Sequence, residues 1–93
     1  MAFKKEIKTN EARTLIYLSN VPVRHRFTRA ISSKLGIDYS YMITTLKTMV
    51  CKGWVSEQRM TSKVYYHLAK KAPLKKAKKL LSEERKLAQR KLD

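Results

Sequence analysis

The sequence predicts a mainly α-helical domain with a small β ribbon, an α+β fold, and three observations support this. Apolar residues recur at spacings of three and four over residues 10–20, 26–35, 38–52 and 73–92, which indicates four amphipathic helices. Residues 54–68 instead alternate between apolar and polar, as in a pair of β-strands. A chain of 93 residues can bury only roughly 60 to 65% of its unfolded surface, so these elements must share one modest core.

The first helix is expected to begin at Asn10, whose side-chain oxygen can cap free N–H groups, and to end near Asn20. Glu11 then lies in the first turn, where the helix dipole favours a negative charge. The inward face is formed by residues that recur at helical spacing, namely Ala12, Leu15, Ile16 and Ser19. Pro22 ends the helix, and residues 21–23 are expected to be extended.

A tight glycine turn separates the second and third helices. The second helix, over residues 26–35, has one apolar side made of Phe27, Ile31 and Leu35. Gly36 ends it, because glycine adopts the left-handed cap conformation without penalty. Asp38 then caps a third helix, which runs to Lys52 and stops at Gly53. Its inward side consists of Met42, Leu46 and Met49.

The rest of the chain is expected to form a hairpin and a last helix. Residues 54–59 and 63–68 are rich in aromatic and β-branched residues and predict two strands, with Met60–Ser62 as the tip between them. Pro73 is expected at the first position of the last helix, where its missing N–H is harmless. That helix runs toward Leu92, and its apolar stripe comprises Leu74, Ala77, Leu81, Ala88 and Leu92, with Leu80 and Leu87 beside it.

Three helices and then a two-stranded ribbon, with a glycine turn between helices two and three, is the order of a winged helix-turn-helix. The stretch from Ile31 to Asp38, the inward residues of the third helix and the run Lys52–Val55 resemble the MarR-like regulators of prokaryotes. The resemblance covers about residues 10–72. The chain is also similar in length, basicity and layout to small winged-helix proteins of crenarchaeal viruses. The resemblance implies that residues 1–72 bind DNA and that residues 73–93 form a dimerisation helix within the same compact unit.

The net charge of +15 calls for an anionic partner. Residues 1–69 carry 12 Lys and Arg against 4 Asp and Glu, and residues 70–93 carry 10 against 3, so the excess is not confined to a tail. A distributed basic surface gains free energy from phosphate neutralisation and counterion release, which favours nucleic acid as the partner, and the resemblance to winged-helix regulators implies double-stranded DNA. An anionic membrane surface is the second interpretation.

In the winged-helix arrangement, the outward face of the third helix enters the major groove and the ribbon, or wing, lies at the adjacent minor groove. The expected contacts are exposed hydroxyl, aromatic and basic residues of helices two and three and of the wing tip, with Arg59 as the candidate for the minor groove. No arginine lies between Arg29 and Arg59, so bidentate reading of guanine by the third helix is not expected. The expected DNA-binding residues are Arg24, Arg26, Arg29, Tyr39, Ser40, Tyr41, Thr44, Lys47, Thr48, Arg59, Ser62 and Lys63.

The last helix is expected to mediate a two-fold homodimer, because its leucine stripe exceeds what a small core needs and because MarR-like proteins dimerise through terminal helices. The expected dimerisation residues are Phe3, Ile7, Leu74, Ala77, Leu81 and Ala88. Two alternatives are that this helix folds back over its own domain or lies on a membrane surface. Cys51 is expected on the outward side of the third helix, where it would either bridge two subunits or stay a reduced thiol.

Other functional classes find little support in the sequence. Two glycines cannot build a phosphate-binding loop, and His25, His67 and the single cysteine have no zinc-ligand spacing, so no cofactor or metal is expected. No carboxylate and histidine converge as a catalytic pair, and no effector pocket is evident. Without a membrane span or a secretory signal, the cytoplasm is the expected location, that of the host cell if the chain is viral.

The function expected from the sequence is therefore sequence-specific regulation of transcription on double-stranded DNA. Two alternatives stay open at this point. The charge also suits a non-specific architectural protein of the chromatin type, and some small basic RNA-binding or ribosome-associated proteins use winged helices.

Overall fold

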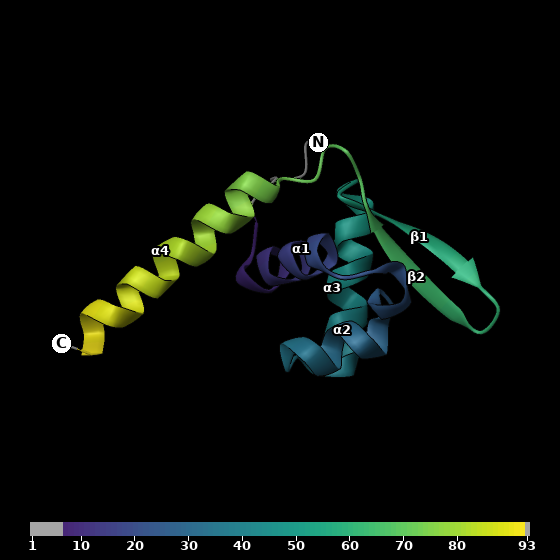
Figure 1. The fold of residues 1–93 in the computed structure, drawn as a ribbon, viewed down its shortest axis with the longest axis horizontal. Helices are drawn as coiled ribbons and strands as arrows, with labels where there is room; N and C mark the ends of the chain where they lie inside the picture. The colour runs from purple at the N-terminus through teal and green to yellow at the C-terminus, as the bar shows by residue number, and fades with distance from the viewer. Residues whose placement is uncertain (1–6, 93) are drawn as a thin grey trace.

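The computed structural model describes the backbone of residues 7–92 and the side chains of residues 7–84. Helices α1 (Thr9–Asn20), α2 (Thr28–Leu35) and α3 (Tyr39–Cys51) form a central group, and a ribbon of strands β1 (Val55–Met60) and β2 (Lys63–Leu68) extends from one side. Helix α4 (Leu74–Leu92) crosses α1 and runs out on the opposite side (Figure 1). The predicted α+β class is confirmed.

Helix α1 begins at Thr9 with Lys8 as its N-cap, so Asn10 lies inside the helix and its expected role as the cap is wrong. The carboxylate of Glu11 accepts a hydrogen bond of 2.9 Å from the Lys8 N–H, which caps the helix from its third position instead. The inward face is also rotated from the one expected. Leu18 is fully buried with Ala12 and Leu15, whereas Ser19 is exposed and Ile16 half-buried.

Val21 and Pro22 are extended, as expected, but the chain then turns through a short 3-10 helix, η1 (Val23–His25), which includes the last residue expected to be extended. The second helix also starts at Thr28 and not at residue 26. Tertiary pairing sets this boundary, because the Arg26 carbonyl accepts a hydrogen bond of 2.9 Å from the Tyr66 N–H of β2. Phe27 then forms a bridge with Tyr65, so this segment lies along the edge of the ribbon.

The turn between α2 and α3 follows the expected pattern. Gly36 has a φ of 67°, in the left-handed region, and the Ile37 N–H donates to the Ser32 carbonyl at 3.0 Å. Asp38 caps α3 by accepting a hydrogen bond of 3.1 Å from the Ser40 N–H. The predicted inward residues of α3 lie in the core, which comprises Ala12, Leu15, Leu18, Ile31, Met42, Leu46, Met49, Trp54, Val55, Tyr66 and Ala77.

The ribbon is a two-stranded antiparallel sheet whose register runs from Val55 opposite Leu68 to Met60 opposite Lys63. Met60 therefore belongs to β1 and not to the tip, which is a tight turn of two residues, Thr61 and Ser62. Thr61 adopts a positive φ of 54°, which fits the right-handed twist of a hairpin with so short a loop.

The first part of α4 packs on its own domain, which is the alternative that the sequence favoured less, and a second chain on this helix stays a prediction. Pro73 precedes the helix as its cap and accepts a hydrogen bond of 3.0 Å from the Ala77 N–H, instead of occupying the first helical position. Ala77 is fully buried in the core, which corrects its assignment to a dimer surface, and Ile7, Leu74 and Leu81 also pack against that core. The side chains of Phe3 and Ala88 lie outside the described residues.

Among the helices that the structure describes, none is both long and apolar enough to cross a membrane.

Candidate nucleic-acid interface

Helix α3 presents a continuous exposed face opposite its buried methionine and leucine side. Tyr39 and Tyr41 are 43% and 51% exposed, although tyrosine usually buries most of its ring. The same face carries the exposed residues Ser40, Thr44, Lys47 and Thr48. All of the residues that the sequence assigned to this helix as DNA contacts are therefore accessible, and the two tyrosines lie at its N-terminal end.

The threonines of this face are oriented by the helix itself. The Thr44 hydroxyl donates to the Ser40 carbonyl at 3.3 Å, and the Thr48 hydroxyl donates to the Thr44 carbonyl at 3.0 Å. Each hydroxyl has thereby used its single proton and keeps outward lone pairs as acceptors. Such a face can accept hydrogen bonds from donor groups of a partner, and the exocyclic amines of adenine and cytosine are the donors in the major groove of DNA.

A groove of about 600 Å³ separates the N-terminal half of α3 from the wing. Its two walls carry cations that are held over aromatic rings. The Arg29 guanidinium lies 5.0 Å from the centre of the Tyr39 ring, and the Lys63 ammonium lies 4.1 Å from the centre of the Phe27 ring. The groove is lined by Phe27, Thr28, Arg29, Tyr39, Ile43, Ser62, Lys63, Val64 and Tyr66. It combines an apolar floor with two positive charges, as suits a sugar–phosphate strand.

Arg59 lies on the groove side of the wing. It is exposed and pairs across the ribbon with Val64, which lines the groove. Side chains of directly opposite strand residues share a face of the ribbon, so the arginine extends that face toward the tip. Ser62 in the turn and Lys63 beside it are exposed as well. The three wing residues expected at the interface thus cluster at one end of the ribbon.

Arg24 and Arg26, which precede α2 and were both expected to contact DNA, differ in accessibility. The Arg26 Nε donates to the Val21 carbonyl at 2.9 Å, and its side chain is half-buried, so it stabilises the turn around η1. Arg24 is exposed, with its Nε 3.3 Å from the Nε2 of His25. Arg24 therefore keeps the accessibility that a phosphate contact needs, while Arg26 is engaged with the backbone of its own chain.

The arrangement of the helices and the wing is similar to that of a solved structure. A point mutant of ZitR from Lactococcus lactis matches 98% of the chain with a TM-score of 0.70. The chain has a winged-helix fold. The sequence identity between the two proteins is 20%. The chain spans 62% of the length of ZitR. No model of a protein family and no curated protein matches the sequence.

Within this winged helix, a buried ion pair joins α1 to the end of α3, and sequence reasoning missed it. Both carboxylate oxygens of Glu11 accept hydrogen bonds from the Lys52 ammonium, at 3.0 and 2.9 Å, and the Glu11 residue is 2% exposed. The ammonium also lies 4.5 Å from the centre of the Trp54 ring. One signal was available, because Glu11 is four and seven residues before Leu15 and Leu18 and therefore on the buried face of α1.

Two tyrosine hydroxyls of the winged helix are held in the neutral form. Burial raises the pKa of Tyr66; a hydrogen bond to Thr28 works against this rise, and the negative charge of Glu57 adds to it. Burial also raises the pKa of Tyr17, whose hydroxyl donates to the His25 carbonyl at 2.9 Å. These tyrosines contribute hydrogen bonds and packing beneath the wing and η1, and no charge near neutral pH.

Cys51, the last residue of α3, is an exposed free thiol in this chain, on the outward side as expected. A bridge to a second copy stays a prediction from the sequence.

Proposed function

We propose that this protein binds double-stranded DNA sequence-specifically and regulates transcription by occupying its sites. In this proposal α3 lies in the major groove, and the β1–β2 wing lies at the adjacent minor groove. The observation that carries it is the exposed face of α3, rich in hydroxyls and aromatic rings, beside a groove whose walls hold Arg29 and Lys63. The likeness to ZitR supports it at the level of the fold. The proposed activity is binding alone, without a chemical step.

Sequence preference would come from hydroxyl acceptors and from apolar contact, since α3 carries no arginine. Thr44 and Thr48 can accept hydrogen bonds from base amines, and the Lys47 ammonium can donate to phosphate or to a guanine edge. The exposed rings of Tyr39 and Tyr41 can contact thymine methyl groups. These features favour sites rich in A·T pairs, with Arg59 reading the width of a minor groove nearby.

The rival function is non-specific architectural binding, and the observation that favours it is the charge of +15 without an arginine on α3. Competition between selected and random duplexes separates the two. A regulator prefers its sites by about a thousandfold or more, whereas a preference below about tenfold would identify an architectural protein. Structured RNA as a competitor tests the RNA-binding alternative in the same assay.

We infer that the protein acts as a two-fold homodimer. Because α1 covers the inner side of α4, we place the contact between the two copies at an apolar groove of about 390 Å³ beside α4. The groove is lined by Arg13, Ile16, Tyr17, Asn20, Val21, Lys34, Leu35 and Leu81. Two copies related by a two-fold axis would read half-sites about one helical turn apart. Sedimentation equilibrium of the Leu81→Glu variant tests this, with dissociation to a monomer as the expected result.

The most direct test of specificity is selection of bound fragments from random DNA, with Thr44→Ala and Arg59→Ala beside the wild type. We expect Thr44→Ala to change the selected sequence, because its hydroxyl faces base edges. We expect Arg59→Ala to weaken binding to all sites and to lower the salt dependence, because it removes one phosphate or minor-groove cation. The reverse pattern would show that the two contacts are misassigned.

A further inference from the structure

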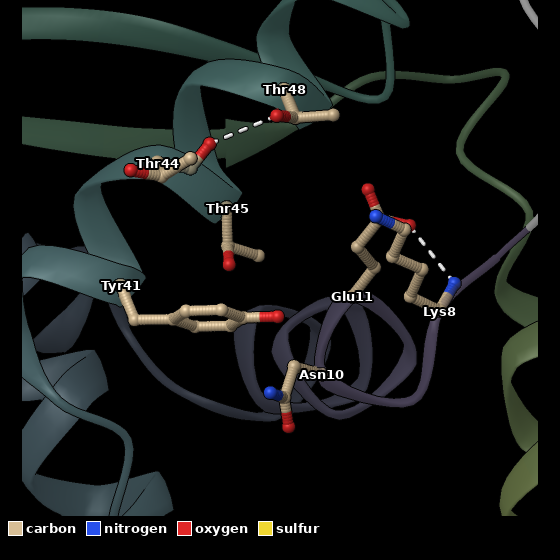
Figure 2. A pocket seen from close by; sticks show the side chains of 7 residues that line it. All are labelled: Lys8, Asn10, Glu11, Tyr41, Thr44, Thr45 and Thr48. Carbon is tan, nitrogen blue, oxygen red and sulfur yellow. Dashed lines mark hydrogen bonds between the residues drawn. The ribbon is translucent and has the colours of Figure 1, made fainter.

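A second, smaller pocket lies on the flank of α3 that faces α1. It has a volume of about 150 Å³, roughly five times the volume of one water molecule in the liquid, which suits a tetrahedral oxyanion and is too small for a nucleobase with its sugar. Two elements supply its walls, the N-terminal turn of α1 and the outward side of α3 (Figure 2). The lining residues are Lys8, Asn10, Glu11, Tyr41, Thr44, Thr45 and Thr48.

Thr45 distinguishes this pocket from an ordinary surface hollow. Its residue is only 8% exposed, and its side chain points from α3 into the space between the two helices (Figure 2). Thr14, Thr44 and Thr48 each donate their hydroxyl proton to a carbonyl four residues earlier. Thr45 makes no hydrogen bond to any residue in the described part of the chain. The hydroxyl opens onto the pocket, so its proton is available to a group that enters it.

The charges around the pocket favour an anion. The N-terminal turn of α1 lines the pocket through Lys8, Asn10 and Glu11, and the positive end of the helix dipole lies at this turn. Lys8 is exposed at the rim. The one carboxylate in the wall, that of Glu11, already accepts from the Lys52 ammonium with both oxygens and from the Lys8 N–H. The charge of Glu11 is therefore already paired, and Lys8 and the helix dipole add positive charge at the pocket.

The pocket lies on the side of α3 opposite the 600 Å³ groove. Tyr41, Thr44 and Thr48 line the pocket, whereas Tyr39 and Ile43 line the groove toward the wing. A helix in the major groove, which is about 12 Å wide, has one phosphate backbone on each side. The wing-side groove can take only one of these two strands, and the pocket faces the other.

We propose that this pocket binds a phosphate group, and that its source is the DNA backbone strand on the α1 side of the recognition helix. Thr45 donates to a phosphate oxygen, the first N–H groups of α1 donate from below, and Lys8 supplies the counter-charge. This inference rests on the proposed function and adds a second anchoring point to it. With phosphate contacts to both DNA strands, α3 has a fixed depth and rotation in the major groove.

The test compares the DNA affinity of Thr45→Val with that of Thr14→Val, by fluorescence anisotropy with a duplex of about 20 base pairs. Valine keeps the shape of threonine and lacks the hydroxyl. Thr45→Val is expected to bind about tenfold or more weakly, because a hydrogen bond to a charged group is lost, with an unchanged or higher unfolding midpoint. Thr14→Val loses its 2.7 Å bond to the Asn10 carbonyl, so it is expected to unfold earlier while its folded form binds DNA like the wild type.

A scan of single neutral methylphosphonates along the duplex then identifies the source of the phosphate. At one position, the methylphosphonate is expected to lower the DNA affinity of the wild type and to leave the already lower affinity of Thr45→Val unchanged. Lys8→Met is expected to lower the slope of the logarithm of the binding constant against the logarithm of the salt concentration by about one. If sodium phosphate, at constant ionic strength, shifts the amide resonances of Asn10 and Thr45 while the scan shows no such position, the pocket takes free phosphate and the DNA source is wrong.

Wild-type affinity for Thr45→Val, together with no response to phosphate, would overturn the pocket assignment. The proposed function has its own control in Lys63→Glu, a variant in the wing-side groove. If Lys63→Glu weakens binding and Thr45→Val does not, only the pocket inference fails. If the wild type binds no duplex at all, the proposed function fails, and the phosphate titration still decides whether the pocket holds an anion.

Discussion

Removing the buried carboxylate of Glu11 should be among the most damaging conservative substitutions in this protein. Glu11→Gln keeps the shape and one acceptor oxygen but removes the negative charge that contacts the Lys52 ammonium at 2.9 Å. The side chains of Lys52 and Glu11 are 8% and 3% exposed, so water cannot replace that charge. Breaking such a pair costs about 3–5 kcal/mol, whereas a domain of this size has a total stability of about 5–14 kcal/mol.

The free energy of unfolding is measured by urea denaturation for the wild type, Glu11→Gln, Lys52→Met and the double variant. With a slope of about 1 kcal/mol per M, Glu11→Gln should lower the midpoint by about 3–5 M. The double variant removes both charges, so it should be more stable than the sum of the single effects predicts, by about 2 kcal/mol or more. A cost below about 1 kcal/mol for Glu11→Gln, or strict additivity in the cycle, would refute the view that this pair joins α1 to α3.

Three other perturbations test separate features. Gly36→Ala should cost about 1–2 kcal/mol in urea denaturation, because φ is 67°, and Gly36→Asn should cost less; nothing lies within 4 Å of the added Cβ, so a much larger loss would show that packing is involved. Because burial raises the pKa of Tyr66 above its unfolded value, the stabilisation is present below about pH 10 and is lost as the pH rises through the folded pKa; Tyr66→Phe should flatten this alkaline loss, and parallel curves for the two proteins would contradict it. If Cys51 bridges two subunits, oxidised protein should run as a dimer on a non-reducing gel and Cys51→Ser as a monomer, whereas monomer from both would exclude the bridge.

The local rules of helix and turn formation were enough to predict the order of elements. Gly36 and Asp38 define the turn before α3 through backbone conformation and capping, and both effects depend only on near neighbours in the chain. The buried face of α3 followed from its apolar spacing for the same reason. The six predicted contact residues of α3 are accordingly exposed, whereas Arg26 before α2 is half-buried and bonded to the Val21 carbonyl.

Features that depend on distant partners could not be predicted in this way. Helix α2 starts later than predicted because the Tyr66 N–H of β2 donates a hydrogen bond to the Arg26 carbonyl. Helix α1 starts earlier than predicted because Glu11 caps it. The ion pair of Glu11 with Lys52 spans 41 positions, and the pocket beside Thr45 exists only where α1 and α3 meet. The packing of Ala77 in the core of its own chain could not be predicted, because an apolar stripe shows that a helix is covered but not which chain covers it.

The central claim is that the exposed face of α3 and the wing meet duplex DNA, and an amide chemical-shift map of the labelled protein with a duplex tests it most directly. The largest changes are expected at residues 39–48 and 59–63, with a smaller group at residues 8–11 if the phosphate pocket is used. Resonances of the core residues should move little. Changes confined to α4, with α3 and the wing unaffected at saturating DNA, would contradict the claim.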